Sequence, residues 1–184
     1  MGKIVLLIPY FGEFPNYFQL YLDSLEINND ILTVLFLTDI DVSKYRFPEN
    51  ALVTYITIDE IRERAQFLMK HQYKVRLNKA DILKKNYKLC DFRPIFCTIF
   101  ADKLGALMLN DADYVGWGDC DLIYGKISNF ISLDKEIYSF IGLHGHFTAF
   151  KYIPDLCMLY KKNSGIGGTP NSRQTLLCRR SAIS

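Results

Sequence analysis

Ile4-Val5-Leu6-Leu7-Ile8 is a run of five consecutive apolar residues, and the turn-forming segment Pro9-Tyr10-Phe11-Gly12 follows it at once. An unbroken apolar run of this length is typical of a strand that is covered on both faces of its sheet. The run is too short for the apolar core of a signal peptide or for a membrane span. The sequence therefore predicts a buried first strand.

A helix and a second strand are expected directly after this strand. Pro15 suits the first turn of a helix. The helix would carry one apolar stripe at helical spacing, formed by Phe18, Tyr21, Leu22 and Leu25. Val34-Leu35-Phe36-Leu37 is typical of a second buried strand, which ends at Thr38-Asp39. This order of strand, helix and strand predicts a parallel pair with a right-handed crossover.

The same alternation continues along the chain. Further strands are expected at residues 53–58, 114–117, 138–141 and 146–150. A helix is expected from Thr57 to about Lys70, because Thr57 and Glu60 have the spacing of a capping box. Another helix is expected with Asp91 as its N-cap, and a short one at 127–131. The pattern predicts a Rossmann-like α/β domain, with a mostly parallel sheet flanked by helices.

The chain of 184 residues has room for one domain with a sizeable core, and 49% of its residues are apolar. We expect this domain at residues 1–164. Residues 165–184 are expected to be a poorly ordered tail, because they begin with glycines, contain no acidic residue and show no periodicity. The five cysteines are odd in number and scattered, which favours free thiols in a reducing compartment such as the cytoplasm.

The net charge of +2 does not indicate a nucleic-acid partner. Basic residues are nevertheless concentrated between Arg62 and Lys88. This segment is either a solvated surface or a basic rim that attracts a phosphate-bearing substrate or an anionic membrane.

Asp119 and Asp121 form the most informative motif. They follow an expected strand and are separated by one residue, so both carboxylates can face the same side. Carboxylate oxygens favour Mg²⁺ or Mn²⁺, and these ions commonly bind substrate phosphates as well. Lys88, Asp91 and Arg93 lie near an expected helix start, where cations and free N–H groups suit phosphate.

Four segments together resemble the GT-A-type glycosyltransferases that use nucleotide sugars. They are Ile8-Pro9-Tyr10-Phe11-Gly12, Tyr87-Lys88-Leu89-Cys90-Asp91-Phe92, Trp117-Gly118-Asp119-Cys120-Asp121 and Gly145-His146-Phe147-Thr148. More narrowly, they resemble a poorly characterised bacterial family whose members accompany capsule and surface-polysaccharide genes. The resemblance spans roughly residues 4–152 and implies the GT-A nucleotide-diphospho-sugar transferase fold.

The resemblance also implies where the nucleotide would bind. Pro9, Tyr10 and Phe11 would lie against the nucleotide base, and Thr38 and Asp39 would contact the base or the ribose. A uridine diphosphate sugar is the favoured donor.

The phosphate and metal contacts implied by the resemblance lie further along the chain. Lys88, Asp91 and Arg93 would reach the ribose or the diphosphate. Asp119 and Asp121 would hold the Mn²⁺ or Mg²⁺ ion.

His146 is the candidate catalytic residue, because the resemblance implies that it faces the donor or the acceptor sugar. Its residue type alone leaves two readings open. It is either a further metal ligand, together with or without His144, or a hydrogen-bonded histidine of the pocket.

The sequence thus predicts a metal-dependent glycosyltransferase in bacterial surface-polysaccharide synthesis. Its acceptor would be a saccharide or a lipid-linked saccharide, reached in the cytoplasm or at the inner face of the membrane. Enzymes of this type normally continue into an acceptor-binding half, so the chain is either reduced there or truncated.

Two other readings stay open. One is a module that binds nucleotide sugars without turnover. The other is a phosphatase that forms an aspartyl-phosphate on the first aspartate of the pair, although no acidic pair follows Asp121.

Overall fold

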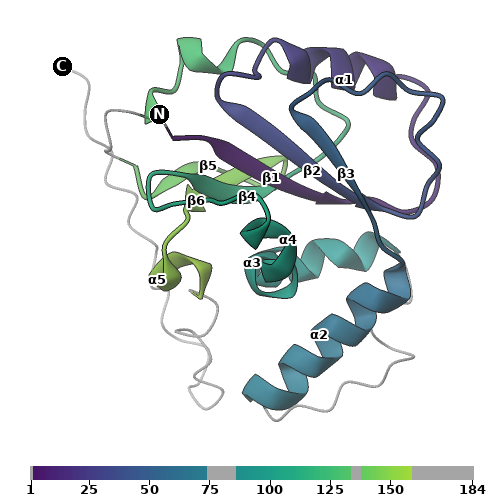
Figure 1. Cartoon of the computed structure of the whole chain (residues 1–184), viewed down its shortest axis with the longest axis vertical. Helices are drawn as coiled ribbons and strands as arrows, with labels where there is room; N and C mark the ends of the chain where they lie inside the picture. Colours follow the sequence, from purple (N-terminus) through teal and green to yellow (C-terminus); the bar gives the residue numbers. More distant parts are fainter. Residues whose placement is uncertain (1, 74–85, 134–137, 159–184) are drawn as a thin grey trace.

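The computed structural model describes residues 2–73, 86–133 and 138–158. These residues form one six-stranded sheet with helices on both faces (Figure 1). The expected tail at 165–184 lies outside the described residues. None of the helices in the described ranges combines the length and the apolar character needed to cross a membrane.

The sheet has two parts. The parallel part contains β1 (Ile4–Pro9), β2 (Leu32–Thr38), β3 (Ala51–Tyr55) and β4 (Tyr114–Gly118). The antiparallel part adds β5 (Phe140–His144) and β6 (Phe147–Lys151), in the overall order β3-β2-β1-β4-β6-β5. The predicted α/β class with a mostly parallel sheet is therefore confirmed.

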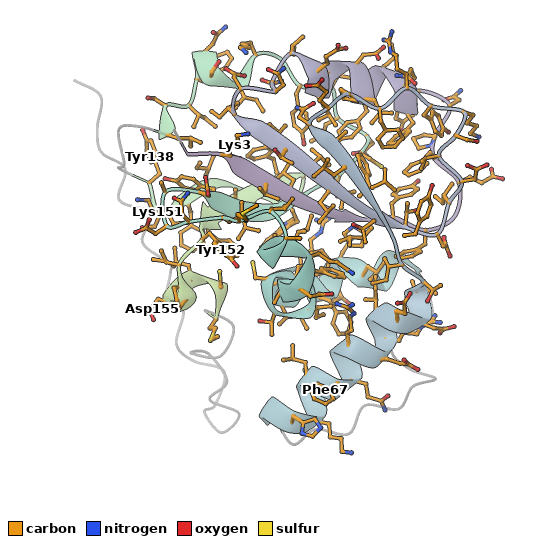
Figure 2. All side chains as sticks on the ribbon, viewed as in Figure 1. Lys3, Phe67, Tyr138, Lys151, Tyr152 and Asp155 are labelled. Atoms are coloured by element: carbon orange, nitrogen blue, oxygen red, sulfur yellow. The ribbon has the colours of Figure 1, made fainter. Side chains whose placement is uncertain are left out.

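The helices divide between the two faces of the sheet. One face is covered by α1 (Phe18–Glu26) and the short 3₁₀ helix η2 (Ile127–Asn129). The other face is covered by α2 (Ile58–Tyr73), the 3₁₀ helix η1 (Asn86–Ile95), α3 (Phe96–Ile99), α4 (Ala101–Gly105) and α5 (Pro154–Cys157). In Figure 2, Phe67 lies on the part of α2 that extends away from the sheet, and its side chain is 66% exposed.

The first strand is covered on both faces, as its unbroken apolar run predicts. Val5 and Leu7 belong to the core beneath α2 and α3, whereas Ile4, Leu6 and Ile8 belong to the core beneath α1. All five side chains are buried. Burying apolar surface stabilises the folded state by about 25 cal/mol for each Å², so this central strand is a main source of stability.

The predicted capping box is confirmed at the start of α2. The Thr57 N–H donates to the Glu60 carboxylate at 2.8 Å, and the Glu60 N–H donates to the Thr57 hydroxyl at 3.2 Å. The preceding strand ends at Tyr55 and not at residue 58 as predicted, because Thr57 leaves the strand to cap the helix.

The prediction of Asp91 as an N-cap is wrong. Asp91 lies inside η1, and the α-helical backbone begins only at Phe96, without a side-chain cap. Pro94 explains the delay, since its ring disfavours α-helical geometry at the residue before it. The apolar residues Ile95, Phe96, Ile99 and Phe100 are nevertheless buried against the sheet.

Gly116 lets the parallel and antiparallel parts of the sheet meet. A Cβ atom at this position would lie 1.8 Å from the backbone oxygen of Thr148 on β6. No side chain fits in that space, so β4 can pair with β6 only if residue 116 is glycine.

Candidate metal centre and adjoining pocket

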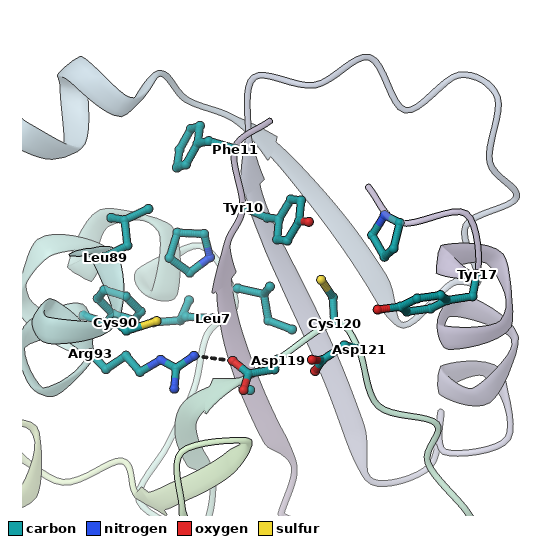
Figure 3. Close-up of a pocket in the computed structure, with 15 residues that line it drawn as sticks. Leu7, Tyr10, Phe11, Tyr17, Leu89, Cys90, Arg93, Asp119, Cys120 and Asp121 are labelled. Carbon is teal, nitrogen blue, oxygen red and sulfur yellow. Dashed lines mark hydrogen bonds and ion pairs between the residues drawn. The ribbon is translucent and has the colours of Figure 1, made fainter. Parts of the chain in front are cut away.

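A pocket of about 350 Å³ opens at the carboxyl ends of β1 and β4 (Figure 3). Ligands of α/β proteins generally bind at this edge of a parallel sheet. The wall contains three charged side chains, those of Arg93, Asp119 and Asp121. The other lining residues are Leu7, Ile8, Pro9, Tyr10, Phe11, Pro15, Tyr17, Leu89, Cys90, Phe96, Gly118 and Cys120.

The two aspartates follow directly on β4 and lie at the same end of the pocket. In Figure 3, Asp119 lies between Arg93 and Asp121. Cys120, the residue between the two aspartates, is buried in the core on the α1 side. This alternation is what an extended backbone produces, and it points both carboxylates toward one region.

His146 joins these aspartates from the turn between β5 and β6. Its Nδ1 lies 2.8 Å from Oδ2 of Asp119, and the Asp119 N–H donates to the His146 carbonyl at 3.1 Å. One ligand atom from each of Asp119, Asp121 and His146 lies within 4.8 Å of the other two. The sequence could not place His146, because its position depends on the antiparallel pairing of β4 with β6.

This set of donors fits a divalent cation. Two carboxylates suit Mg²⁺ or Mn²⁺, and an imidazole nitrogen suits transition metals better than Mg²⁺. Burial, together with the neighbouring Asp121 carboxylate, raises the pKa of Cys120 to about 12. The Cys120 thiol is therefore protonated at neutral pH, and the ligands offered to an ion are oxygen and nitrogen.

Arg93 connects the aspartates to the β5–β6 turn. Its Nη2 donates to Oδ1 of Asp119, and its Nη1 donates to the carbonyl oxygen of Gly145 at 2.7 Å. The side chain of Arg93 is 17% exposed, and that of Asp119 is 26% exposed. Because the pair is partly shielded from water, its attraction is stronger than that of a surface ion pair.

Aromatic side chains form another part of the pocket wall. Tyr10 stacks on Phe14 with 4.8 Å between ring centroids, and Phe14 stacks on Phe18 at 3.8 Å. Tyr10, Phe11 and Tyr17 all line the pocket. Burial raises the pKa of Tyr10, so its hydroxyl stays neutral and donates to the Glu13 carbonyl.

The structure brings most, but not all, of the candidate residues to this pocket. Pro9, Tyr10, Phe11, Arg93, Asp119 and Asp121 line it, and His146 contacts Asp119 beside it. Thr38, Asp39 and Asp91 are not part of its wall.

These last residues have other surroundings. Thr38 is buried, and its hydroxyl accepts the Ile40 N–H at 3.1 Å, whereas Asp39 and Asp91 are exposed. The side chains of Lys88 and His144 lie outside the described part of the chain.

Nine of the fifteen lining residues were not among those predicted for the site, including Pro15, Tyr17 and Cys90. Pro15 and Tyr17 lie in the segment between β1 and α1, and Cys90 lies in η1. Aromatic residues are common throughout this chain, so nothing in the sequence singled out Tyr17.

The comparison with known families gives one match. The model of a family described as "Family of unknown function (DUF6625)" matches residues 6–176, a range that includes every residue of the candidate site. No curated protein and no solved structure matches the chain.

Proposed function

We propose that this chain, which belongs to the family of unknown function DUF6625, is a metal-dependent glycosyltransferase. It would move a sugar from a nucleoside-diphosphate sugar to a saccharide acceptor. The observation that carries the proposal is the cluster of Asp119, Asp121 and His146 beside a pocket whose wall also contains aromatic rings.

The pocket wall offers groups for both parts of a nucleoside diphosphate. The base is flat and can stack on an exposed aromatic ring such as that of Tyr10 or Tyr17. The diphosphate is anionic and suits Arg93 and the three metal-ligand candidates. A pocket with only one of these two features would fit many other ligands.

The residues of the chain have separate tasks in this proposal. Asp119, Asp121 and His146 hold the ion, and the aromatic wall fixes the base. When bound, a divalent cation supplies Lewis-acid stabilisation to the leaving diphosphate. Pro9 ends β1 in register with Leu37 of β2 and leads directly to Tyr10 in the pocket wall.

The finer features predicted from the resemblance belong to the same proposal. They are the GT-A variant of the α/β fold, a uridine diphosphate sugar as donor and a saccharide or lipid-linked saccharide as acceptor. The reaction would take place in the cytoplasm or at the inner face of the membrane, as part of bacterial surface-polysaccharide synthesis.

Titration calorimetry with uridine diphosphate tests the proposal. The wild type and the double variant Asp119→Ala/Asp121→Ala are titrated with and without Mn²⁺, beside guanosine and cytidine diphosphates. Asp102→Asn is the matched control, since Asp102 also pairs with an arginine, Arg64, but lies outside the pocket.

We expect Mn²⁺-dependent binding in the wild type and in the control, and at least about tenfold weaker binding in the double variant. Equal binding in the double variant would remove the metal centre from the proposal. Failure of every diphosphate to bind a folded wild type would overturn the proposal as a whole.

One observation favours the module that binds without turnover. Both carboxylates in the described wall of the pocket belong to the metal cluster, so that wall offers no separate carboxylate as a base. Release of uridine diphosphate from its sugar conjugates separates the two readings. Tight, Mn²⁺-dependent binding without any release, with a panel of acceptors present, would favour the module.

The phosphatase reading receives less support from the pocket. That chemistry needs a lysine and a further acidic pair beside the nucleophilic aspartate. Among the described residues, no lysine lines the pocket, and both oxygens of Asp119 already contact Arg93 and His146. Hydrolysis of an aryl phosphate by the wild type would reverse this preference.

A further inference from the structure

We propose that Arg93 is the positioning residue of the metal centre, which holds Asp119 and His146 at the spacing of neighbouring ligands. This inference rests on the proposed function, because it concerns the ion that the function requires. It assigns Arg93 a task different from the contact with the ribose or the diphosphate that the resemblance implies.

Arg93 joins the two segments that carry these ligands. One nitrogen of its guanidinium group donates to Asp119 at the end of β4, and another donates to Gly145 in the β5–β6 turn. The Asp119 N–H donates to His146 in the same turn. Figure 3 shows the Arg93 side chain reaching across from η1 to the Asp119 carboxylate.

The two oxygens of the Asp119 carboxylate have different partners. Oδ1 accepts from Arg93, and Oδ2 lies 2.8 Å from Nδ1 of His146. In an octahedral site with ligand distances of about 2.1 Å, adjacent ligand atoms lie about 3.0 Å apart. Oδ2 and Nδ1 lie at a hydrogen-bond distance that is also close to the separation of two adjacent ligands, while Arg93 occupies the other oxygen. An ion held by both atoms would replace the proton of that hydrogen bond.

Gly145 lies close to the guanidinium group of Arg93. A Cβ atom built on Gly145 would lie 3.2 Å from Nη1 of Arg93, which is closer than most contacts of real Cβ atoms. A Cβ atom here would require the guanidinium group to shift by a few tenths of an ångström. That shift would disturb the hydrogen bond that Arg93 donates to the carbonyl oxygen of Gly145.

The geometry of the guanidinium group explains why the residue is arginine. Its planar fork presents several N–H donors in fixed directions, so one side chain can bridge a carboxylate and a carbonyl oxygen. Lysine carries the same charge on a single flexible ammonium group. The variant Arg93→Lys therefore keeps the charge of the site and removes the bridge.

Binding of Mn²⁺ alone to the full chain tests the inference, measured by electron paramagnetic resonance of the free ion. Partners of metal ligands typically change affinity 10–100-fold when mutated, so we expect Arg93→Lys to bind Mn²⁺ about 10–100-fold more weakly than the wild type. Gly145→Ala should weaken binding in the same direction.

Arg64→Lys is the matched control. Arg64 also bridges a carboxylate and a carbonyl oxygen, those of Asp102 and Ile99, but it does so outside the pocket. It should bind Mn²⁺ as the wild type does. Thermal unfolding of each variant establishes that it is folded.

A second measurement separates positioning from a direct phosphate contact. If Arg93 acts through the ligands, saturating Mn²⁺ restores the affinity of Arg93→Lys for uridine diphosphate to the wild-type value. A deficit that persists at saturating Mn²⁺ would overturn the inference in favour of a direct contact.

The remaining outcomes are also decisive. Unchanged or tighter Mn²⁺ binding by a folded Arg93→Lys would overturn the inference and leave the proposed function standing, with tighter binding meaning that Arg93 competes with the ion. Absence of Mn²⁺ binding in the folded wild type would overturn both proposals together.

Discussion

The two aspartates of the site differ in their surroundings, although the sequence presents them as a pair. Asp119 contacts Arg93 through one oxygen, His146 through the other, and the β5–β6 turn through its N–H group. Asp121 is exposed. One residue is thus part of the framework of the protein, and the other is available mainly to a ligand.

This difference predicts unequal effects on stability. Asp119→Ala should lower the free energy of unfolding by about 1–3 kcal/mol, because it leaves the largely buried guanidinium group of Arg93 without its anionic partner. Asp121→Ala should change it by less than about 0.5 kcal/mol. Urea unfolding of both variants without metal measures the difference, and equal losses would contradict it.

The thiols of Cys97 and Cys157 are hydrogen-bonded to each other. A hydrogen bond between Cys97 and Cys157 lowers the pKa of Cys157 and raises the pKa of Cys97. Cys157 is the more exposed of the two. Below the usual pKa of a thiol, Cys157 therefore has the larger thiolate fraction, and the thiolate is the reactive form.

Alkylation with iodoacetamide at a series of pH values, read by mass spectrometry, tests this prediction. Cys157 should react at lower pH than an ordinary thiol, while Cys97 should remain protected until the protein unfolds. The variant Cys97→Ala removes the hydrogen bond, so the pH profile of Cys157 should move upward. An unchanged profile would contradict the assigned cause.

At the scale of elements, the segment after the acid pair is held to the end of α1. Asn28 is fully buried, and its side-chain amide donates to Ser24 and to Gly125. Its side-chain oxygen accepts the Ile127 N–H at 2.7 Å. One side chain thus satisfies three backbone groups and fixes the loop that begins at Asp121.

Removal of these bonds should be costly. Asn28→Ala removes all three hydrogen bonds of a buried side chain, so we expect the free energy of unfolding to fall by at least about 2 kcal/mol. Asn129→Ala, on the exposed helix η2, is the control and should change stability by less than about 0.5 kcal/mol. A loss below about 1 kcal/mol in Asn28→Ala, measured by urea unfolding, would mean that water replaces the amide.

Local sequence rules predicted the elements whose signals are themselves local. The capping box of Thr57 and Glu60 and the apolar run of β1 depend on neighbouring residues, and both are confirmed. The start near Asp91 was wrong because Pro94, three residues later, changed the geometry of that turn. The fixed backbone geometry of Pro94 therefore outweighed the capping preference of Asp91.

At the scale of the whole molecule, the pairing of distant strands is what the sequence could not predict. The parallel order of β1 and β2 followed from the helix between them. Nothing local indicates that β6 pairs with β4, although Gly116 at the contact is a trace of it. That pairing brings His146 to Asp119, whereas Arg93 reaches Asp119 from η1, so the acid pair was predictable and its contacts were not.

The position of β4 between β1 and β6 also sets an order of events during synthesis of the chain. The first three strands can pair once residue 55 has left the ribosome, but Ile4 must wait for Tyr114, and Gly118 for Phe147. Contacts so distant along the chain form late, because closing a long loop costs entropy before any contact compensates for it. The nascent chain can thus pair its first three strands well before Asp119 and His146 come together at the candidate site.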